Sequence, residues 1–184
     1  MRRTSARLIA TLSLVCVAYV AAPETADAQV KPEMAFQFGP TVGLELSPDA
    51  ATVGAFFLVH NALVNLTALK FMAEATYGFG LQDLGPNASY NTFRLAVTAL
   101  YLVALSNPAF ALYPLAGLAY YRYNWSYDGF NGIGFSPSYN DIVLVVGAAA
   151  MYNNFLGRVN LGLGGGSDFT IGVGYAFGSA PAAE

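Results

Sequence analysis

The fold is decided by Phe169-Thr170-Ile171-Gly172-Val173-Gly174-Tyr175-Ala176-Phe177, a stretch in which large and small residues alternate without a break. Side chains of a β-strand point to opposite faces in turn. One face therefore carries two Phe, an Ile, a Val and a Tyr, while the other carries Thr, two Gly and Ala. The large face suits contact with lipid, and the small face suits the lining of a narrow barrel.

The amino-acid composition also indicates a protein surrounded by lipid. Charged residues make up 10% of the 184 residues and hydrophobic residues 55%, whereas an ordinary soluble domain has about 25% charged residues. So few charges would cover the surface of a soluble protein poorly, and lipid as the outer solvent removes that difficulty. The formal net charge is −3, and there is no basic patch in the sequence, so we expect no nucleic-acid partner.

The first residues have the pattern of a secretory signal peptide. Arg2, Arg3 and Arg7 precede an uncharged, mostly apolar run from Leu8 to Ala22, and Ala26-Asp27-Ala28 then supplies small residues for cleavage. The alternative is an uncleaved anchor, but the run is short for a membrane span of about 20 residues. We therefore expect residues 1–28 to be removed.

The only cysteine, Cys16, lies inside this apolar run. Its removal with the signal peptide leaves a mature chain without disulfides, thiol chemistry or cysteine metal sites. We expect no cofactor and no metal.

Alternation recurs along the rest of the chain and predicts eight strands: Ala35 to Leu46, Thr52 to His60, Leu69 to Leu81, Tyr90 to Val103, Phe110 to Tyr123, Ile142 to Met151, Phe155 to Leu163 and Phe169 to Phe177. Short connections alternate with longer ones, of which 124–141 is the longest. This order predicts an all-β fold, a transmembrane eight-stranded antiparallel up-and-down β-barrel over residues 29–177, followed by a short flexible tail at 178–184.

A helical membrane protein is the structural alternative. The segment from Leu95 to Tyr121 contains no charged residue and could form a helical hairpin broken at Asn107-Pro108. The 19 glycines and the repeated alternation favour strands.

With these features, the chain resembles the small bacterial outer-membrane β-barrel family, the eight-stranded OmpA/OmpX-like group. The last strand carries the sharpest likeness: Thr170, Gly172, Tyr175 and Phe177 match the family's assembly signal in order, although seven residues follow Phe177. The resemblance implies a bacterial outer-membrane location, periplasmic termini, outer-membrane lipid as a partner and recognition of these four residues by the barrel-assembly machinery.

The predicted registers turn five charged residues toward the barrel interior: Glu45, Lys70, Glu74, Arg94 and Arg158. Side chains fill the interior of a barrel of about eight strands, and charges buried there must pair. We therefore expect these residues to plug the lumen. A small passive pore, similar to a porin channel, is the alternative.

Aromatic residues gather around the longest connection. Trp125, Tyr127, Phe130, Phe135 and Tyr139 form a candidate contact surface for a ligand or partner outside the cell, whose identity the sequence does not reveal. The alternative is an aromatic girdle at the membrane interface.

His60 is the only histidine. A histidine can act as a catalytic base, so an outer-membrane lipid-modifying enzyme is a further alternative. Such an enzyme would need a serine and an acid near the histidine, whereas Asn61-Ala62-Leu63 follows it. We therefore expect a non-enzymatic protein with a structural or surface-interaction role.

Overall fold

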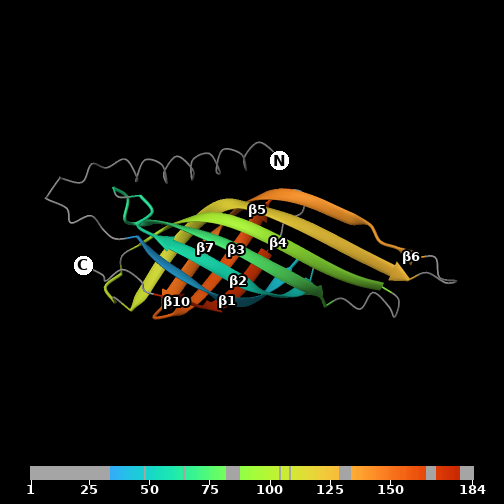
Figure 1. Cartoon of the computed structure of the whole chain (residues 1–184), viewed down its shortest axis with the longest axis horizontal. Helices are drawn as coiled ribbons and strands as arrows, with labels where there is room; N and C mark the ends of the chain where they lie inside the picture. Colours follow the sequence, from blue (N-terminus) through green and yellow to red (C-terminus); the bar gives the residue numbers. More distant parts are fainter. Residues whose placement is uncertain are drawn as a thin grey trace, which may run out of the picture. The chain divides into compact units, whose positions relative to one another are not determined.

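The chain forms β-strands in the order that the sequence predicts (Figure 1). The computed structural model describes residues 34–47, 49–63, 65–81, 88–103, 105–107, 109–128, 134–164 and 169–178. Its long strands are β1 (Ala35–Leu46), β2 (Asp49–His60), β3 (Leu69–Gly80), β4 (Ala88–Tyr101), β5 (Phe110–Asp128), β7 (Ser138–Tyr152), β8 (Phe155–Leu163) and β9 (Phe169–Tyr175). Two short strands, β6 (Gly134–Phe135) and β10 (Phe177–Gly178), extend β7 and β9.

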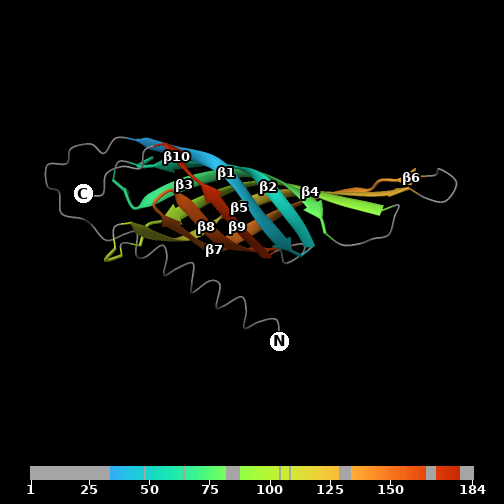
Figure 2. The ribbon, with the colours of Figure 1, turned by 90° about the horizontal axis from the view of Figure 1, so that it is seen from below.

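The strands close into a barrel. Each long strand pairs antiparallel with the next one, and β1 pairs with β9 through Leu44 opposite Ile171. β10 continues the same seam, with Phe38 opposite Phe177. The predicted pairing of the last strand with the first is confirmed, and so is the eight-stranded up-and-down barrel (Figure 2).

An apolar band covers the outside of the barrel. Outward residues of β1 and β9 are large and exposed, as Phe38 at 55% and Val173 at 57% illustrate. The band continues over Phe57 of β2, Phe79 of β3 and Val97 of β4. An exposed apolar surface that encircles the barrel is unfavourable in water and matches the lipid-facing side of a membrane barrel.

The inside of the barrel is filled by the opposite set of positions. Buried polar residues include Gln37, Thr41, Glu45, Lys70, Glu74, Thr92, Arg94, Arg158, Asn160 and Thr170. Phe56 and Leu58 of β2 also point inward and are buried, whereas Phe57 between them is exposed. This explains why the sequence of β2 is apolar on both faces.

The structure corrects the longest predicted connection. Residues 124–141 are mostly strand, because β5 runs to Asp128 and β7 begins at Ser138, with β6 pairing between them. The register of β5 against β7 stays continuous from Phe110 opposite Tyr152 to Asn124 opposite Ser138. Cross-strand pairing therefore overrides the Gly, Ser and Asn content that favours a loop. The beginning of β4 stays paired with this hairpin as far as Ala88 opposite Tyr127. The end of the hairpin and the beginning of β4, which we call the protruding sheet, extend past the other strands (Figure 2).

Other strand boundaries differ from the prediction by one to three residues. β2 begins at Asp49 rather than at residue 52, because Asp49 pairs with Leu46 across a tight turn. β3 ends one residue early, and β4 runs from Ala88 to Tyr101 instead of from residue 90 to 103. The predicted last strand is interrupted at Ala176, and Gly178, which the sequence places in the tail, pairs with Gln37.

The helical alternative is wrong, because β4 and β5 occupy most of the segment that could form a helical hairpin. In the described part of the chain, no helix is long and apolar enough to cross a membrane. The predicted signal peptide and residues 179–184 of the tail lie outside the described residues.

Candidate functional site

A cluster of ionised side chains lies inside the barrel, centred on Glu74 of β3. Arg94 of β4 donates from Nη1 to Glu74 Oε2 over 2.6 Å, and Arg158 of β8 pairs with the other carboxylate oxygen. All three side chains are almost completely buried. One carboxylate therefore joins strands on opposite sides of the lumen.

Neighbouring strands hold Arg158 in place. Its Nη2 donates to Thr41 Oγ1 of β1 over 3.3 Å, and Thr41 Oγ1 donates in turn to the carbonyl oxygen of Val173 over 3.1 Å. Gly172 lies directly opposite Arg158 in the register. A Cβ at this glycine would lie 2.8 Å from Arg158 Nε, so the absent side chain makes room for the guanidinium.

Glu45 extends the cluster along β1. Its Oε2 accepts a hydrogen bond from Thr92 Oγ1 of β4 over 3.0 Å. Arg94 lies on the same inward face as Thr92, and its guanidinium carbon lies 5.7 Å from the ring centre of Tyr121 on β5. Four of the five predicted lumen charges, Glu45, Glu74, Arg94 and Arg158, are thus buried in the part of the interior that this cluster occupies.

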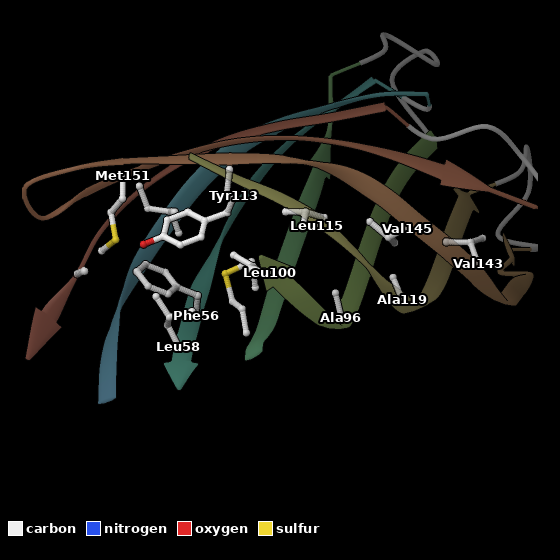
Figure 3. Close-up of a cluster of buried hydrophobic side chains, with 14 of the residues drawn as sticks. Phe56, Leu58, Ala96, Leu100, Tyr113, Leu115, Ala119, Val143, Val145 and Met151 are labelled. Atoms are coloured by element: carbon white, nitrogen blue, oxygen red, sulfur yellow. The ribbon is translucent and has the colours of Figure 1, made fainter. Parts of the chain in front are cut away.

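Buried apolar side chains also line the interior along the barrel, from Met151 and Tyr113 to Tyr121 and Val143 (Figure 3). The sequence prediction missed that they form one cluster. Phe56, Leu58, Leu100, Tyr113 and Met151 come from four strands and lie close together in this view. Their exposed fractions are 1–6%. A signal existed, since large apolar residues occupy inward positions near one end of several strands. The expectation that charges dominate the lumen concealed it.

A row of hydrogen-bonded polar side chains crosses β1, β2 and β3. It lies at the end of the barrel where the described residues begin and end. Lys70 Nζ donates to His60 Nδ1 over 2.7 Å, so the Nε2 of the imidazole carries the proton that it donates to Gln37 Oε1 over 2.8 Å. Lys70 also lies 6.0 Å from the ring centre of Tyr113. This fifth predicted charge therefore belongs to a separate group from the other four.

His60 has no arrangement typical of a hydrolase. Both ring nitrogens bond to Lys70 and Gln37, and the residue is 1% exposed. Neither partner is a nucleophile or an orienting carboxylate of the kind that a catalytic triad uses. Within the described ranges, no group of three or more His, Cys, Asp and Glu residues is placed to hold a metal ion.

The protruding hairpin carries aromatic side chains on the face that continues the inner wall of the barrel. Tyr123 stacks on Tyr121 with ring centres 5.7 Å apart, and it also stacks on Tyr90 of β4 and Tyr139 of β7. Trp125 contacts Tyr90 with a centroid distance of 4.7 Å. We call the exposed part of this face, made of Trp125, Tyr127, Phe135 and Tyr139, the aromatic face.

Phe130, the fifth residue of the predicted contact surface, lies outside the described residues. The other four lie on strands rather than in a loop, with Tyr127 directly opposite Phe135. Because they share the face of the inward residue Tyr121, they do not point toward lipid as girdle residues would.

The opposite face of the hairpin changes from apolar to polar along its length. Leu118 and Ile142 are exposed and apolar, whereas the next outward positions are Tyr120, Arg122, Asn124 and Ser126 on β5 and Asn140 and Ser138 on β7. Lipid-facing positions are apolar, so this change marks the upper limit of the lipid-facing band.

The four residues of the predicted assembly signal divide between two faces. Thr170 and Gly172 are buried, whereas Tyr175 and Phe177 are exposed. The rings of Tyr175 and Phe177 lie 5.0 Å apart, and Phe177 also approaches Phe38 across the closing seam.

Solved structures include several barrels that are similar to this one. A major outer membrane protein from Thermus thermophilus has a TM-score of 0.62 and 13% identity, over 79% of this chain and 100% of that chain. The N-terminal β-barrel domain of Pseudomonas aeruginosa OprF has a TM-score of 0.48 and 18% identity, over 78% and 97%. Ail, the attachment invasion locus protein of Yersinia pestis, has a TM-score of 0.44 and 13% identity, over 80% and 100%. No protein-family model and no curated protein matches the sequence.

The chain has the fold of a small outer-membrane β-barrel. At 13% identity, the likeness to the Thermus protein concerns the fold alone. The function must therefore be argued from the residues of this chain.

Proposed function

We propose that this chain is a non-enzymatic integral protein of a bacterial outer membrane, with a closed lumen and a role in contacts at the cell surface. The observation that carries the proposal is the protruding sheet. It extends past the lipid-facing band and is aromatic on one face and polar on the other.

The length of β5 supports a projection beyond the membrane. Its 19 residues correspond to about 60 Å at about 3.3 Å per residue. A tilted strand needs only about 9–11 residues to cross a bilayer. The hairpin of β5 and β7 therefore has the length to stand in water beyond the headgroups.

The filled interior supports a closed lumen. The ion cluster around Glu74 and the apolar cluster around Tyr113 are both buried from solvent. Barrels of about eight strands have just enough interior for side chains. A conducting path would have to displace one of these clusters.

Planar-bilayer recording tests this closure. Refolded protein should give no reproducible single-channel steps above the current of a bilayer exposed to heat-denatured protein. Stepwise conductance of uniform size from several preparations would favour the pore and contradict the closed lumen. Folding is verified by the shift in gel mobility between unheated and heated samples.

We further propose that the aromatic face is the contact surface. Large aromatic side chains provide much contact area at a low cost in conformational entropy, and the buried Tyr121 and partly buried Tyr123 support the exposed rings from below. The exposed fractions of Tyr127, Tyr139 and Phe135 are 54%, 57% and 68%. So much aromatic area outside lipid is unfavourable unless it meets a partner.

Cells that display the protein provide the test. A variant with Trp125, Tyr127, Phe135 and Tyr139 replaced by serine should lose attachment to at least one surface in a panel of immobilised glycans and proteins. The matched control replaces Ser126 and Ser138 on the opposite face by alanine and should attach as the native protein does. Equal attachment of both variants to every surface that the native protein binds would contradict the assignment.

We also propose that the termini are periplasmic and that the assembly machinery recognises Thr170, Gly172, Tyr175 and Phe177. The described chain begins and ends at the same end of the barrel, opposite the protruding sheet. In cells, Phe177→Ser should reduce the amount of assembled barrel several-fold, while refolding of the pure variant into detergent stays close to native. Equal losses in both assays would indicate a purely structural role for Phe177.

A further inference from the structure

Arg122 stands apart from the other described cations. Lys70, Arg94 and Arg158 are buried in the lumen, whereas Arg122 is exposed on the outward face of β5. No carboxylate forms an ion pair with it among the residues that the structure describes. Its directly opposite neighbours are Phe93 on β4 and Asn140 on β7.

The polar groups around Arg122 offer several hydrogen-bond donors. Arg122 Nε donates to Asn124 Oδ1 over 3.2 Å, and Tyr120 OH donates to Asn140 Oδ1 over 2.9 Å. Both amide oxygens are therefore engaged within the group. The terminal nitrogens of the guanidinium and the two amide NH₂ groups are left to donate outward.

The position of Arg122 along the barrel axis places it at the level of the lipid headgroups. Tyr120 lies one outward position beyond Leu118, and Arg122 lies one further. Successive positions on one face are about 7 Å apart along a strand. Leu118 is 57% exposed and Ile142 is 68% exposed, so Arg122 lies just past the edge of the apolar band. Tyrosine is typical of this interface, and the charged headgroups lie next to it.

We propose that Arg122, with Asn124 and Asn140, binds the phosphate of an anionic lipid headgroup in the leaflet at this end of the barrel. A guanidinium matches a phosphate with two parallel hydrogen bonds. The inference rests on the proposed membrane location, since the band must face lipid for a headgroup to reach Arg122.

The site explains why one side of the barrel is polar at this level. On β1, β3 and β9 the outward residues at the same end are still apolar, such as Leu46, Phe79 and Phe169. In contrast, the side formed by β5 and β7 continues upward with Arg122, Asn124 and Asn140. A bound headgroup would therefore be held beside the base of the protruding sheet.

Lipid retention measures the binding. The full barrel is reconstituted in nanodiscs of phosphatidylcholine, with or without phosphatidic acid, and native mass spectrometry reports the phosphatidic acid that stays bound after release. Arg122→Gln should lower this retention about tenfold, because the lost hydrogen bonds are charge-assisted. Asn140→Ala should lower it less, and Ser126→Gln, on the same face but further out, should leave it unchanged.

Additional arms separate the possible outcomes. Arg122→Lys keeps the charge without the planar guanidinium and should retain an intermediate amount of lipid. If Arg122→Gln does not fold, Arg122→Lys takes its place in the retention assay. Inorganic phosphate at a concentration equal to that of the lipid should not displace the lipid. Displacement would overturn the assignment to a headgroup in favour of a free anion, and native retention by both Arg122 variants would overturn the site.

Membrane insertion is checked independently by heat-modifiable gel mobility in the same nanodiscs. Failure to insert would contradict the proposed function. Insertion without selective retention of phosphatidic acid would contradict only the lipid site.

Discussion

Glu74→Gln should be the most damaging conservative change in the interior. The substitution keeps the size of the side chain but removes the negative charge between Arg94 and Arg158. At the 2.6 Å separation of Arg94 and Glu74, the attraction of two unit charges is about 6 kcal/mol for an effective dielectric constant of about 20. Desolvation of the buried ions offsets part of this energy.

Removing one partner of a buried pair typically costs about 3–5 kcal/mol, because the other charge is left uncompensated. The glutamine oxygen still accepts one hydrogen bond, so we expect a loss near the lower limit, about 3 kcal/mol. The assay is urea unfolding in lipid vesicles, followed by the change in gel mobility, with native protein measured in parallel.

The quadruple variant Glu45→Gln, Glu74→Gln, Arg94→Gln and Arg158→Gln is the matched control. It contains no buried charge from this cluster and should recover at least half of the loss. A loss below about 1 kcal/mol for Glu74→Gln, or a quadruple variant less stable than the single one, would refute the reasoning that charge compensation holds the cluster together.

Three further changes test other parts of the barrel by the same unfolding assay. Gly172→Ala should cost about 1–3 kcal/mol, because its Cβ displaces the guanidinium, and the cost should shrink when Arg158→Met is already present. His60→Ala leaves its lysine and glutamine neighbours without their hydrogen bonds and should cost about 1–3 kcal/mol; purified native protein should show no lipid turnover, and turnover abolished by this change would instead support an enzyme. Val173→Arg on the lipid-facing band should cost about 2–4 kcal/mol, whereas Ser126→Arg should stay within about 0.5 kcal/mol; similar effects of these two changes would contradict the lipid boundary.

The strand content could be predicted because alternation is a local property. Each lipid-facing residue, such as Phe38 or Val173, meets the same solvent whichever strand lies beside it. The pattern therefore survives in the sequence without knowledge of any partner. For this reason the sequence predicts β1 and β8 with their observed bounds.

The protruding hairpin could not be predicted from its sequence. Residues such as Gly134 and Asn140 favour turns, and nothing local indicates that β5 and β7 continue to pair. The continuous register, set by the barrel below, decides it. The same register turns Trp125 and Tyr139 away from lipid. The sequence alone had left open whether these residues form a membrane girdle or a contact surface.

On strands with a clear alternation, the sequence by itself determined which residues face lipid, because membrane-facing positions must be apolar. On β2, which is apolar on both faces, the structure decided it. It also indicated that Glu74, Arg94 and Arg158 point inward. Only the tertiary structure decided that a single carboxylate joins both arginines, that Lys70 instead bonds to His60, and that Arg122 lies just past the edge of the apolar band. Glu74 and Arg158 lie on strands far apart in the chain, and barrel closure brings them together. Lys70 and His60 lie on the consecutive strands β3 and β2, and the register between these strands decides their contact.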